Sequence, residues 1–394
     1  MAITKVALKT NHLSLYLEND KGMVFNHVNH CLFHLPAVSI ALLLAIDEYS
    51  DEKQALEYVV QNSNIPLKKL QPLYHKIAQL FNRQQEQSTY LDGRYPEVFQ
   101  SVGKHKLQSS NKITTYKIAN VTFLISVESP VLQNEIEKLL HPCKHNLTEV
   151  DVVISIRNTK QGNSDSFELF SHDLLINEKL TFAEVMPELI DRLQIIAFQK
   201  SDYRFCFHGA ALQTPDGNLL LPGKSGAGKS TLSAFLTHNN NGLFSDEMIV
   251  LDENFNVKVL TLPIAIKSGS WHILQPYFPE LTQASIWHRL DGRQLKYVWP
   301  TTFADQSFKT NALLVNPNFI HLTESSLPEG ELPKAEALTV IDTIEMLTQG
   351  GYQLGFELNT TKLEQLIHFL TQTKCYTLSY ASNEQAQMKL KHLW

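Results

Sequence analysis

The eight residues at positions 223–230, Gly-Lys-Ser-Gly-Ala-Gly-Lys-Ser, match the phosphate-binding pattern G-x-x-x-x-G-K-[ST] at every fixed position. The apolar run at 219–221 predicts a buried strand before them, and residues 232–236 predict the start of a helix after them. Glycines allow the loop between two such elements to fold tightly, so that its N–H groups point at phosphate oxygens. The sequence therefore predicts a strand, a phosphate-binding loop (P-loop) and a helix in succession. A glycine-rich turn that only caps the helix is the alternative.

The residue types in this loop predict its chemistry. Lys229 is expected to reach the β- and γ-phosphates of a nucleoside triphosphate, and the Ser230 hydroxyl to ligate Mg²⁺. The N-terminus of the following helix adds the positive end of a dipole. The expected cofactors are therefore ATP or GTP, with Mg²⁺. The residues assigned to nucleotide binding are Gly223, Lys224, Ser225, Gly226, Ala227, Gly228, Lys229, Ser230 and Thr231.

Composition excludes several classes of protein. The chain has 394 residues, 43% of them hydrophobic, so it can bury a large core, and its length favours two or three domains. The net charge is −6 and no strongly basic segment occurs, which argues against a general nucleic-acid surface. No stretch approaches 18 apolar residues, so no membrane partner is expected. Four widely separated cysteines and the lack of an apolar signal at 1–10 favour a cytoplasmic location.

The first 90 residues predict a small domain of two strands and three helices. Leu13, Leu15 and Leu17 alternate with polar residues as in a half-buried strand, and 23–25 predict its hairpin partner after a turn at 19–22. Helices are predicted over 36–47 and 53–61, and a third is expected to begin at Pro66. This order of elements is a winged-helix-like α+β layout.

This layout resembles the PqqD-like peptide-recognition domains that accompany peptide-modifying enzymes. The resemblance implies that a leader peptide adds a strand to an exposed sheet edge. A plain accessory domain is the alternative, because no invariant motif supports the resemblance. A DNA-binding role is disfavoured, because the third helix carries few base-reading side chains. The expected organisation is a PqqD-like domain at 1–92, a linker at 93–112 and one nucleotide-binding catalytic domain at 113–394.

The second domain begins with a predicted hairpin at 115–125, a strand at 150–156 and a packing helix at 182–200. Towards the C-terminus, 332–338 predict the start of a helix with Pro333 in its first turn, 362–374 a packing helix and 375–380 a last strand. No linker separates these segments from the P-loop, so they are assigned to one catalytic unit.

Two segments flank the P-loop with chemically useful residues. His208 and Gly209 precede it within an apolar run, and Asp246 and Glu247 begin an apolar strand shortly after it. Phosphoryl transfer depends mainly on positioning and on neutralising charge, and a carboxylate that is ionised at pH 7 can orient an acceptor hydroxyl. The arrangement therefore favours a phosphotransfer site over a bare nucleotide-binding loop.

This order of His-Gly, strand, P-loop and acidic pair resembles the HPr kinase family, whose core is related to phosphoenolpyruvate carboxykinases. The resemblance is clearest over 200–270 and implies an α/β fold with a mixed, mostly antiparallel sheet. It further implies that Asp246 is the catalytic acidic residue, whose carboxylate accepts the proton of the attacking hydroxyl, that Asp246 and Glu247 bind Mg²⁺ with Ser230, and that His208 lies near the γ-phosphate. Hexamers or smaller homo-oligomers are compatible with it.

Each flanking residue also has an ordinary structural interpretation. Asp246 could serve only a strand-entry turn or a helix cap, His208 could be a packed histidine, and Glu247 could hold a basic partner. Downstream, Lys267, Arg289 and Arg293 are candidates for binding phosphate or substrate. The alternatives are an exposed strand-end lysine for the first and surface ion pairs for the arginines.

The chain also departs from the family. The Glu-Val-Arg-Gly-Leu-Gly signature of HPr kinases is absent from 257–271, which argues against the carrier protein HPr as substrate and against the reverse reaction. The leading hypothesis is an ATP-dependent kinase that acts on a Ser or Thr hydroxyl of a peptide or protein, with a leader peptide as a possible partner. The alternatives are a nucleotide-gated binding module that presents a peptide to a partner enzyme, and a simple NTPase.

Overall fold

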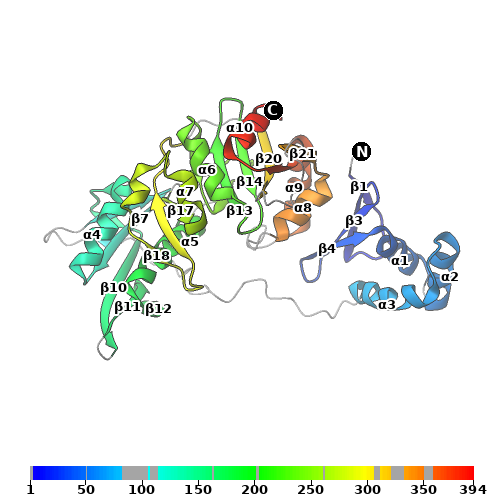
Figure 1. Cartoon of the computed structure of the whole chain (residues 1–394). Coiled ribbons are helices and arrows are strands. Elements are labelled where there is room, and N and C mark those ends of the chain that lie inside the picture. Colours follow the sequence, from blue (N-terminus) through cyan, green and yellow to red (C-terminus); the bar gives the residue numbers. More distant parts are fainter. Residues whose placement is uncertain are drawn as a thin grey trace. The chain divides into compact units, whose positions relative to one another are not determined.

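The computed structural model describes residues 3–49, 51–81, 105–106, 114–161, 164–200, 204–260, 262–305, 311–320, 332–349 and 358–394. It is a mixed α/β structure with two compact units (Figure 1). Unit 1 comprises Met1–Asp92 with Ala335–Thr377, and unit 2 comprises Gly93–Lys334 with Leu378–Trp394. This division differs from the boundaries expected from the sequence, because residues 335–377 group with the front of the chain. Most of the expected linker at 93–112 lies outside the described residues.

The strands of unit 1 form one antiparallel sheet in the order β1-β2-β3-β4. The predicted hairpin is confirmed, and Asn19 at its turn has the left-handed φ of 57°. The strands on either side of that hairpin were not predicted. Their bounds are β1 (Thr4–Val6), β2 (Leu13–Glu18), β3 (Lys21–Asn26) and β4 (Cys31–Pro36).

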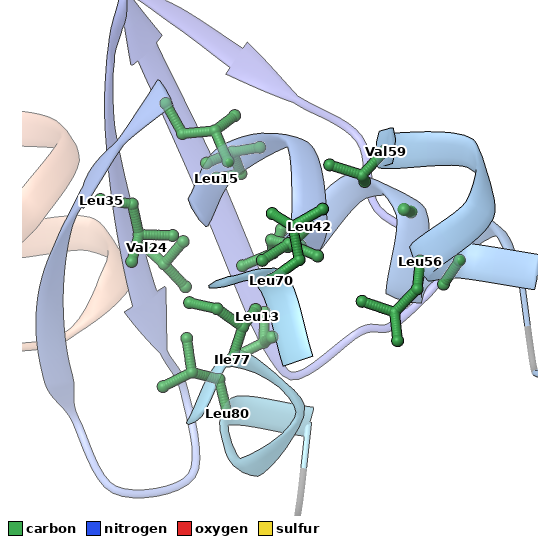
Figure 2. Packing of buried hydrophobic residues seen from close by; sticks show 14 residues of the cluster. Leu13, Leu15, Val24, Leu35, Leu42, Leu56, Val59, Leu70, Ile77 and Leu80 are labelled. Atoms are coloured by element: carbon green, nitrogen blue, oxygen red, sulfur yellow. The ribbon is translucent and has the colours of Figure 1, made fainter. Parts of the chain in front are cut away.

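Three helices follow the sheet, as predicted: α1 (Ala37–Glu48), α2 (Glu52–Asn62) and α3 (Leu67–Ala78). Asp51 caps α2 by accepting a hydrogen bond from the Gln54 N–H group. The helices pack on the sheet through one apolar cluster, in which Leu42 and Leu70 lie centrally (Figure 2). The buried members of this cluster are Leu13, Leu15, Val24, Leu35, Ile40, Leu42, Leu43, Ala45, Ala55, Leu56, Val59, Leu70, Ile77 and Leu80.

Two further helices complete unit 1, namely α8 (Val340–Gln349) and α9 (Thr360–Gln372). Helix α8 contacts β2 and β3, and the carboxylate of buried Glu18 accepts a hydrogen bond from the Ile341 N–H at 2.9 Å. Lys5 of β1 pairs with Glu364 of α9 at 2.6 Å. The predicted packing helix at 362–374 is thus confirmed as α9.

The predicted helix start at 332–338 is wrong. Lys334–Ala337 form strand β21 instead, and helix α8 begins only at Val340. The helix was predicted from Pro333 and its neighbours alone. The backbone of this segment instead forms hydrogen bonds with a strand that is distant in sequence, as the Leu338 N–H donates to the Cys375 carbonyl. That partner strand is β22 (Lys374–Tyr380), the predicted last strand.

The first sheet of unit 2 has the order β12-β11-β10-β7-β6-β8. The predicted hairpin of β6 and β7 is confirmed, and β10 joins β7 in parallel. Residues 105–106, within the expected linker, form strand β5 (His105–Lys106), which pairs with β9 (Glu149–Val150). The other strands are β6 (Thr115–Ile118), β7 (Val121–Val127), β8 (Lys144–His145), β10 (Val152–Gln161), β11 (Ser164–Ser171) and β12 (Leu174–Leu180).

Two helices accompany this sheet, α4 (Pro130–Leu139) and α5 (Phe182–Gln199). Helix α5 begins with a capping box between Thr181 and Glu184, and it contacts strands β11 and β12. The apolar positions that predicted a packing face are all buried: Val185, Leu189, Leu193 and Ile196.

The second sheet of unit 2 contains the P-loop strand. Its order is β15-β13-β14-β20-β22-β21, with β16 also paired to β13, and the division into two units falls within β21 and within β22. Strand β13 is antiparallel to its three partners, whereas β14 and β20 are parallel, so this sheet is mixed and its pairings at β13 are antiparallel. Its remaining strands are β13 (Phe205–Gln213), β14 (Asn218–Pro222), β15 (Gly242–Ser245), β16 (Met248–Leu251) and β20 (Ala312–Phe319).

Helix α6 (Lys229–His238) follows the P-loop and contacts β13, and the chain ends in α10 (Asn383–Lys391) (Figure 1). A small sheet of order β17-β19-β18 lies beside α6. All four cysteines are buried and unpaired by disulfides. In the described part of the chain, no helix combines the length and apolar character that a membrane span requires. The small sheet contains β17 (Ile264–Lys267), β18 (Trp287–His288) and β19 (Gln294–Val298).

Candidate active site

The P-loop joins β14 to α6 through a backbone that only glycine accommodates without strain. Gly223, Gly226 and Gly228 have φ angles of 144°, 91° and 89°. A Cβ atom on Gly223 would lie 2.5 Å from Oδ1 of Asn316, and one on Gly228 would lie 2.9 Å from the Tyr380 hydroxyl. No atom lies within 4 Å of a Cβ built on Gly226. The loop is therefore packed at both ends and open at its tip.

Lys229 is buried at the base of this loop, with 6% of its surface exposed. Its ammonium donates hydrogen bonds to the carbonyls of Gly223 and Lys224 at 2.7 and 2.8 Å, and it lies 3.0 Å from Nε2 of His208. Burial lowers the pKa of Lys229 to about 8, although the charge of Glu247 opposes that shift. The ammonium is thus held in place by neutral acceptors.

His208 links the lysine to the acidic pair. Its Nδ1 lies 3.1 Å from the carbonyl oxygen of Glu247, which can only accept a hydrogen bond, so Nδ1 carries the proton. Its Nε2 is then the acceptor that faces the Lys229 ammonium. Burial lowers the pKa of His208, which favours this neutral form. The structure therefore brings His208 and Lys229 into direct contact.

Asp246 faces the first turns of helix α6. Its carboxylate accepts hydrogen bonds from the hydroxyl of Ser233, at 3.1 Å, and from that of Ser230. Its carbonyl accepts one from the Gln194 side chain at 3.0 Å. Burial raises the pKa of Asp246 to about 6, and the neighbouring charge of Glu247 adds to that shift. A carboxylate with this pKa is still mostly ionised at neutral pH.

The acidic pair offers oxygen ligands of the kind that Mg²⁺ prefers. Mg²⁺ is commonly bound by one or two carboxylates together with water and substrate phosphates. Ser230 and Asp246 are hydrogen-bonded to each other, so their oxygens form an adjacent pair at the P-loop helix. No group of three or more His, Cys, Asp or Glu side chains that could hold a metal occurs among the described residues. The donor set therefore fits a metal that is shared with a polyphosphate.

Glu247 has a backbone conformation that a non-glycine residue rarely adopts, with φ of 80°. Its carbonyl accepts two hydrogen bonds, from the Gly209 N–H at 3.0 Å and from the His208 ring at 3.1 Å. Its carboxylate lies 3.6 Å from Nδ1 of His208. The turn between β15 and β16 is thus pinned to strand β13 in a strained state, as is common at functional sites.

Gly209 has a steric role that explains why a glycine follows His208. A Cβ atom at this position would lie 2.5 Å from the Leu221 carbonyl oxygen and 2.8 Å from the Cα of Pro222. Both of these atoms belong to the backbone of β14, immediately before the P-loop, so neither can move aside cheaply. Glycine therefore lets β13 approach the P-loop strand closely.

The three candidate substrate cations divide between two places. Lys267 and Arg293 both donate hydrogen bonds to the hydroxyl of Ser225 at the tip of the P-loop, at 3.1 and 3.3 Å. Arg289 instead lies 3.4 Å from the carboxylate of Asp191 in α5. Lys267 is half-buried, which differs from the fully exposed strand-end lysine considered as its alternative.

One assigned nucleotide-binding side chain is engaged elsewhere. The hydroxyl of Thr231 donates a hydrogen bond to that of Ser270 at 2.7 Å. Conversely, the sequence interpretation missed Gln194 and Asp191, because α5 was assigned to packing alone. Burial raises the pKa of Asp191 to about 6, and the charge of Arg289 opposes that shift. A usable signal existed, since the polar residues at 188, 191 and 194 recur every three positions along this helix.

No protein-family model matches the chain, and no curated protein matches it.

Proposed function

We propose that this chain is an ATP-dependent kinase that transfers the γ-phosphate to a Ser or Thr hydroxyl of a peptide or protein. The observation that carries the proposal is the position of the Asp246 carboxylate. It is bonded to Ser230 and Ser233 at the start of the P-loop helix, beside the contact between His208 and Lys229. A carboxylate at this position can hold Mg²⁺ with the loop serine, and it can also serve as the group that orients an acceptor hydroxyl and takes its proton.

The proposal includes the fold identity suggested by the resemblance. The mixed, mostly antiparallel sheet around β13 and β14 supports an HPr kinase-like P-loop domain. The four strands followed by three helices in unit 1 support a PqqD-like, winged-helix-like domain. Four buried cysteines that form no disulfide support a cytoplasmic location.

The phosphate-binding residues act through position and charge. The backbone N–H groups of the P-loop and the Lys229 ammonium would bind the phosphates of the nucleotide. The Ser230 hydroxyl with the Asp246 and Glu247 carboxylates would hold Mg²⁺, which when bound neutralises part of the phosphate charge. His208 orients the lysine, because its Nε2 accepts from the ammonium while Nδ1 is fixed on the Glu247 carbonyl.

Asp246 is assigned as the residue that orients the acceptor hydroxyl and takes its proton. Its pKa of about 6 leaves it ionised near neutral pH while making it a stronger base than an exposed aspartate. Gln194 positions it by holding its backbone carbonyl, and Ser233 fixes one carboxylate oxygen. These contacts keep the carboxylate at the P-loop helix before any substrate arrives.

Unit 1 is the proposed site for a leader-peptide partner. Strands β1 and β4 are the two edges of its sheet, and an extended peptide can add to such an edge. A compact unit of this kind also favours the second candidate, a nucleotide-gated module that presents a peptide to a partner enzyme. Turnover distinguishes the two, since such a module binds nucleotide without transferring phosphate.

The test is phosphate incorporation from Mg·ATP into serine-containing peptides. Asp246→Asn should abolish transfer while nucleotide binding persists, whereas Lys229→Met should weaken nucleotide binding itself. Asp252→Asn is the matched control, because Asp252 pairs with Lys258 at 2.7 Å outside this site. Equal incorporation by wild type and Asp246→Asn would refute the kinase proposal. Phosphate release that ignores every peptide would favour an NTPase instead.

A further inference from the structure

Two cations from separate segments of the chain donate to one hydroxyl at the tip of the P-loop. Lys267 is the last residue of β17, and Arg293 directly precedes β19. Both donate hydrogen bonds to the Ser225 hydroxyl. Ser225 is exposed, as are its neighbours Lys224 and Gly226. The two cations therefore converge at a surface that a dissolved ligand can reach.

The positive charge at this point is incompletely balanced. Lys267 is half-buried, and its pKa is lowered by burial and by the charge of Arg293, while the charge of Glu247 opposes that shift. Among the described residues, no carboxylate forms an ion pair with Lys267, and its ammonium donates to the neutral hydroxyl of Ser225. Arg293 uses two nitrogens on Asp291 and keeps the third for Ser225. Lys267, half-buried with only a hydroxyl as acceptor, therefore favours an oxyanion, because charge-assisted hydrogen bonds are stronger than bonds to a hydroxyl; Arg293 is exposed and can turn one nitrogen to the same oxyanion.

This cationic point is separate from the phosphate-binding lysine. Lys229 is buried at the base of the loop, where it is bonded to the Gly223 and Lys224 carbonyls. Lys267 and Arg293 approach the same loop from the small sheet β17-β19-β18, where Lys267 pairs in register with Leu295. One P-loop thus has cations at two positions, base and tip.

We propose that Lys267 and Arg293 form a second oxyanion subsite, which binds a phosphate or carboxylate group beyond the phosphates held by the loop backbone and Lys229. This proposal depends on one part of the proposed function, namely that the P-loop binds a polyphosphate. Its oxyanion has two possible sources: the terminal phosphate of the nucleotide, or an acidic group beside the acceptor hydroxyl. In both cases the oxyanion replaces Ser225 as the hydrogen-bond acceptor.

The first experiment measures calorimetric binding of tripolyphosphate and pyrophosphate to the full chain. Lys267→Met should weaken tripolyphosphate binding roughly tenfold and pyrophosphate binding less, as expected for losing one charge-assisted hydrogen bond. Arg293→Met should act in the same direction. Lys258→Met removes the same charge from a lysine that pairs with Asp252, so it controls for net charge. This outcome identifies the terminal phosphate as the oxyanion.

The second experiment titrates the chain, saturated with a non-hydrolysable ATP analogue, with two synthetic peptides. One carries serine between glutamates and the other serine between glutamines. A preference for the glutamate peptide that Lys267→Met removes would identify an acidic acceptor group. If Lys267→Met matches Lys258→Met with both polyphosphates and both peptides, the subsite does not exist. Weaker polyphosphate binding by Lys229→Met would then leave the P-loop assignment intact. A chain that transfers no phosphate but shows the Lys267 effect keeps the subsite and loses the kinase proposal.

Discussion

The ammonium of Lys229 lies 3.0 Å from Nε2 of His208, whose Nδ1 is bonded to the carbonyl of Glu247. One ring therefore joins the phosphate-binding lysine to the turn that carries the acidic pair. Since the ring is fixed as a neutral acceptor on its lysine side, the ammonium is oriented without an ion-pair partner that would compete with phosphate. The lysine and the acidic pair are consequently expected to respond to pH as one site.

The first prediction is a bell-shaped pH dependence of kcat/KM. Activity should rise as Asp246 ionises with a pKa of about 6, and it should fall as Lys229 loses its proton with a pKa of about 8. Initial-rate measurements across this range provide the test. Lys229→Arg should move the alkaline limb to higher pH, because arginine stays charged there. An alkaline limb that stays in place in this variant would assign it to another group.

The second prediction concerns the stability cost of the Asp246 carboxylate. Its folded-state pKa is raised, so the protonated form is favoured in the fold, and stability is lost as pH rises from the unfolded pKa through about 6. Asp246→Asn should therefore raise the free energy of unfolding by about 1–2 kcal/mol at neutral pH, allowing for partial solvent access. The gain should vanish below about pH 4, where both states are protonated. Urea unfolding at the two pH values tests this, and an equal gain at both would contradict it.

The third prediction isolates backbone strain at Glu247, whose φ is 80°. Glu247→Gly and Glu247→Ala both remove the carboxylate, but only glycine relieves the left-handed conformation. The glycine variant should exceed the alanine variant by about 1 kcal/mol in free energy of unfolding. Chemical denaturation of the pair measures this difference directly. Equal stabilities would mean that the turn relaxes in the alanine variant.

The fourth prediction tests the close approach of β13 to the P-loop strand. Gly209→Ala would place a Cβ atom 2.5 Å from the Leu221 carbonyl oxygen, so it should destabilise the chain by about 2–3 kcal/mol. Gly269→Ala is the control, because no atom lies within 4 Å of its added Cβ and its φ is not positive. The control should change stability by less than about 0.5 kcal/mol. Comparable losses in both variants would exclude the steric explanation.

The fifth prediction addresses unit 1. Buried Glu18 accepts a hydrogen bond from the Ile341 N–H in the first turn of α8, so Glu18→Ala should cost about 1–2 kcal/mol. Glu18→Gln keeps an acceptor oxygen and should cost less. Lys21→Met serves as the surface comparison, because it breaks the ion pair of Lys21 with Asp342. The Lys21 side chain is 46% exposed. This substitution should cost under about 1 kcal/mol. Thermal unfolding of the three variants ranks these effects.

The sequence predicted those parts of the fold that depend on neighbouring residues. The strand, loop and helix of the P-loop, the hairpin of β2 and β3 and the capped helix α2 all follow local rules of spacing, turns and caps. The spacing of apolar residues along the chain did not indicate that the sheet is mixed. Only the family resemblance implied it. The strand at Lys334–Ala337 was predicted as a helix start because its own residues carry no signal of the pairing with the distant strand β22.

Long-range contacts account for the parts of the site that sequence reasoning missed. Gln194 meets the Asp246 carbonyl across 52 positions of sequence, and Arg293 meets Ser225 across 68. Contacts between residues so far apart in the sequence leave no pattern in the spacing of apolar and polar residues. Helix α5 was therefore predicted to serve packing alone. The grouping of residues 335–377 with the front of the chain depends on contacts such as that of Glu18 with Ile341, which are 323 positions apart.

The discontinuity of unit 1 has a consequence for synthesis of the chain on the ribosome. Residues 1–92 are made before the helices α8 and α9 that complete their unit, and α9 ends only at Gln372. At about 5–20 residues per second, the ribosome needs roughly 12–50 s to make the intervening segment Gly93–Lys334. During that interval the faces of β2 and β3 that α8 later covers lack their partner. The sheet of unit 1 therefore stays without this partner until the ribosome has passed α8, even though the local structure of the sheet is encoded within residues 1–92.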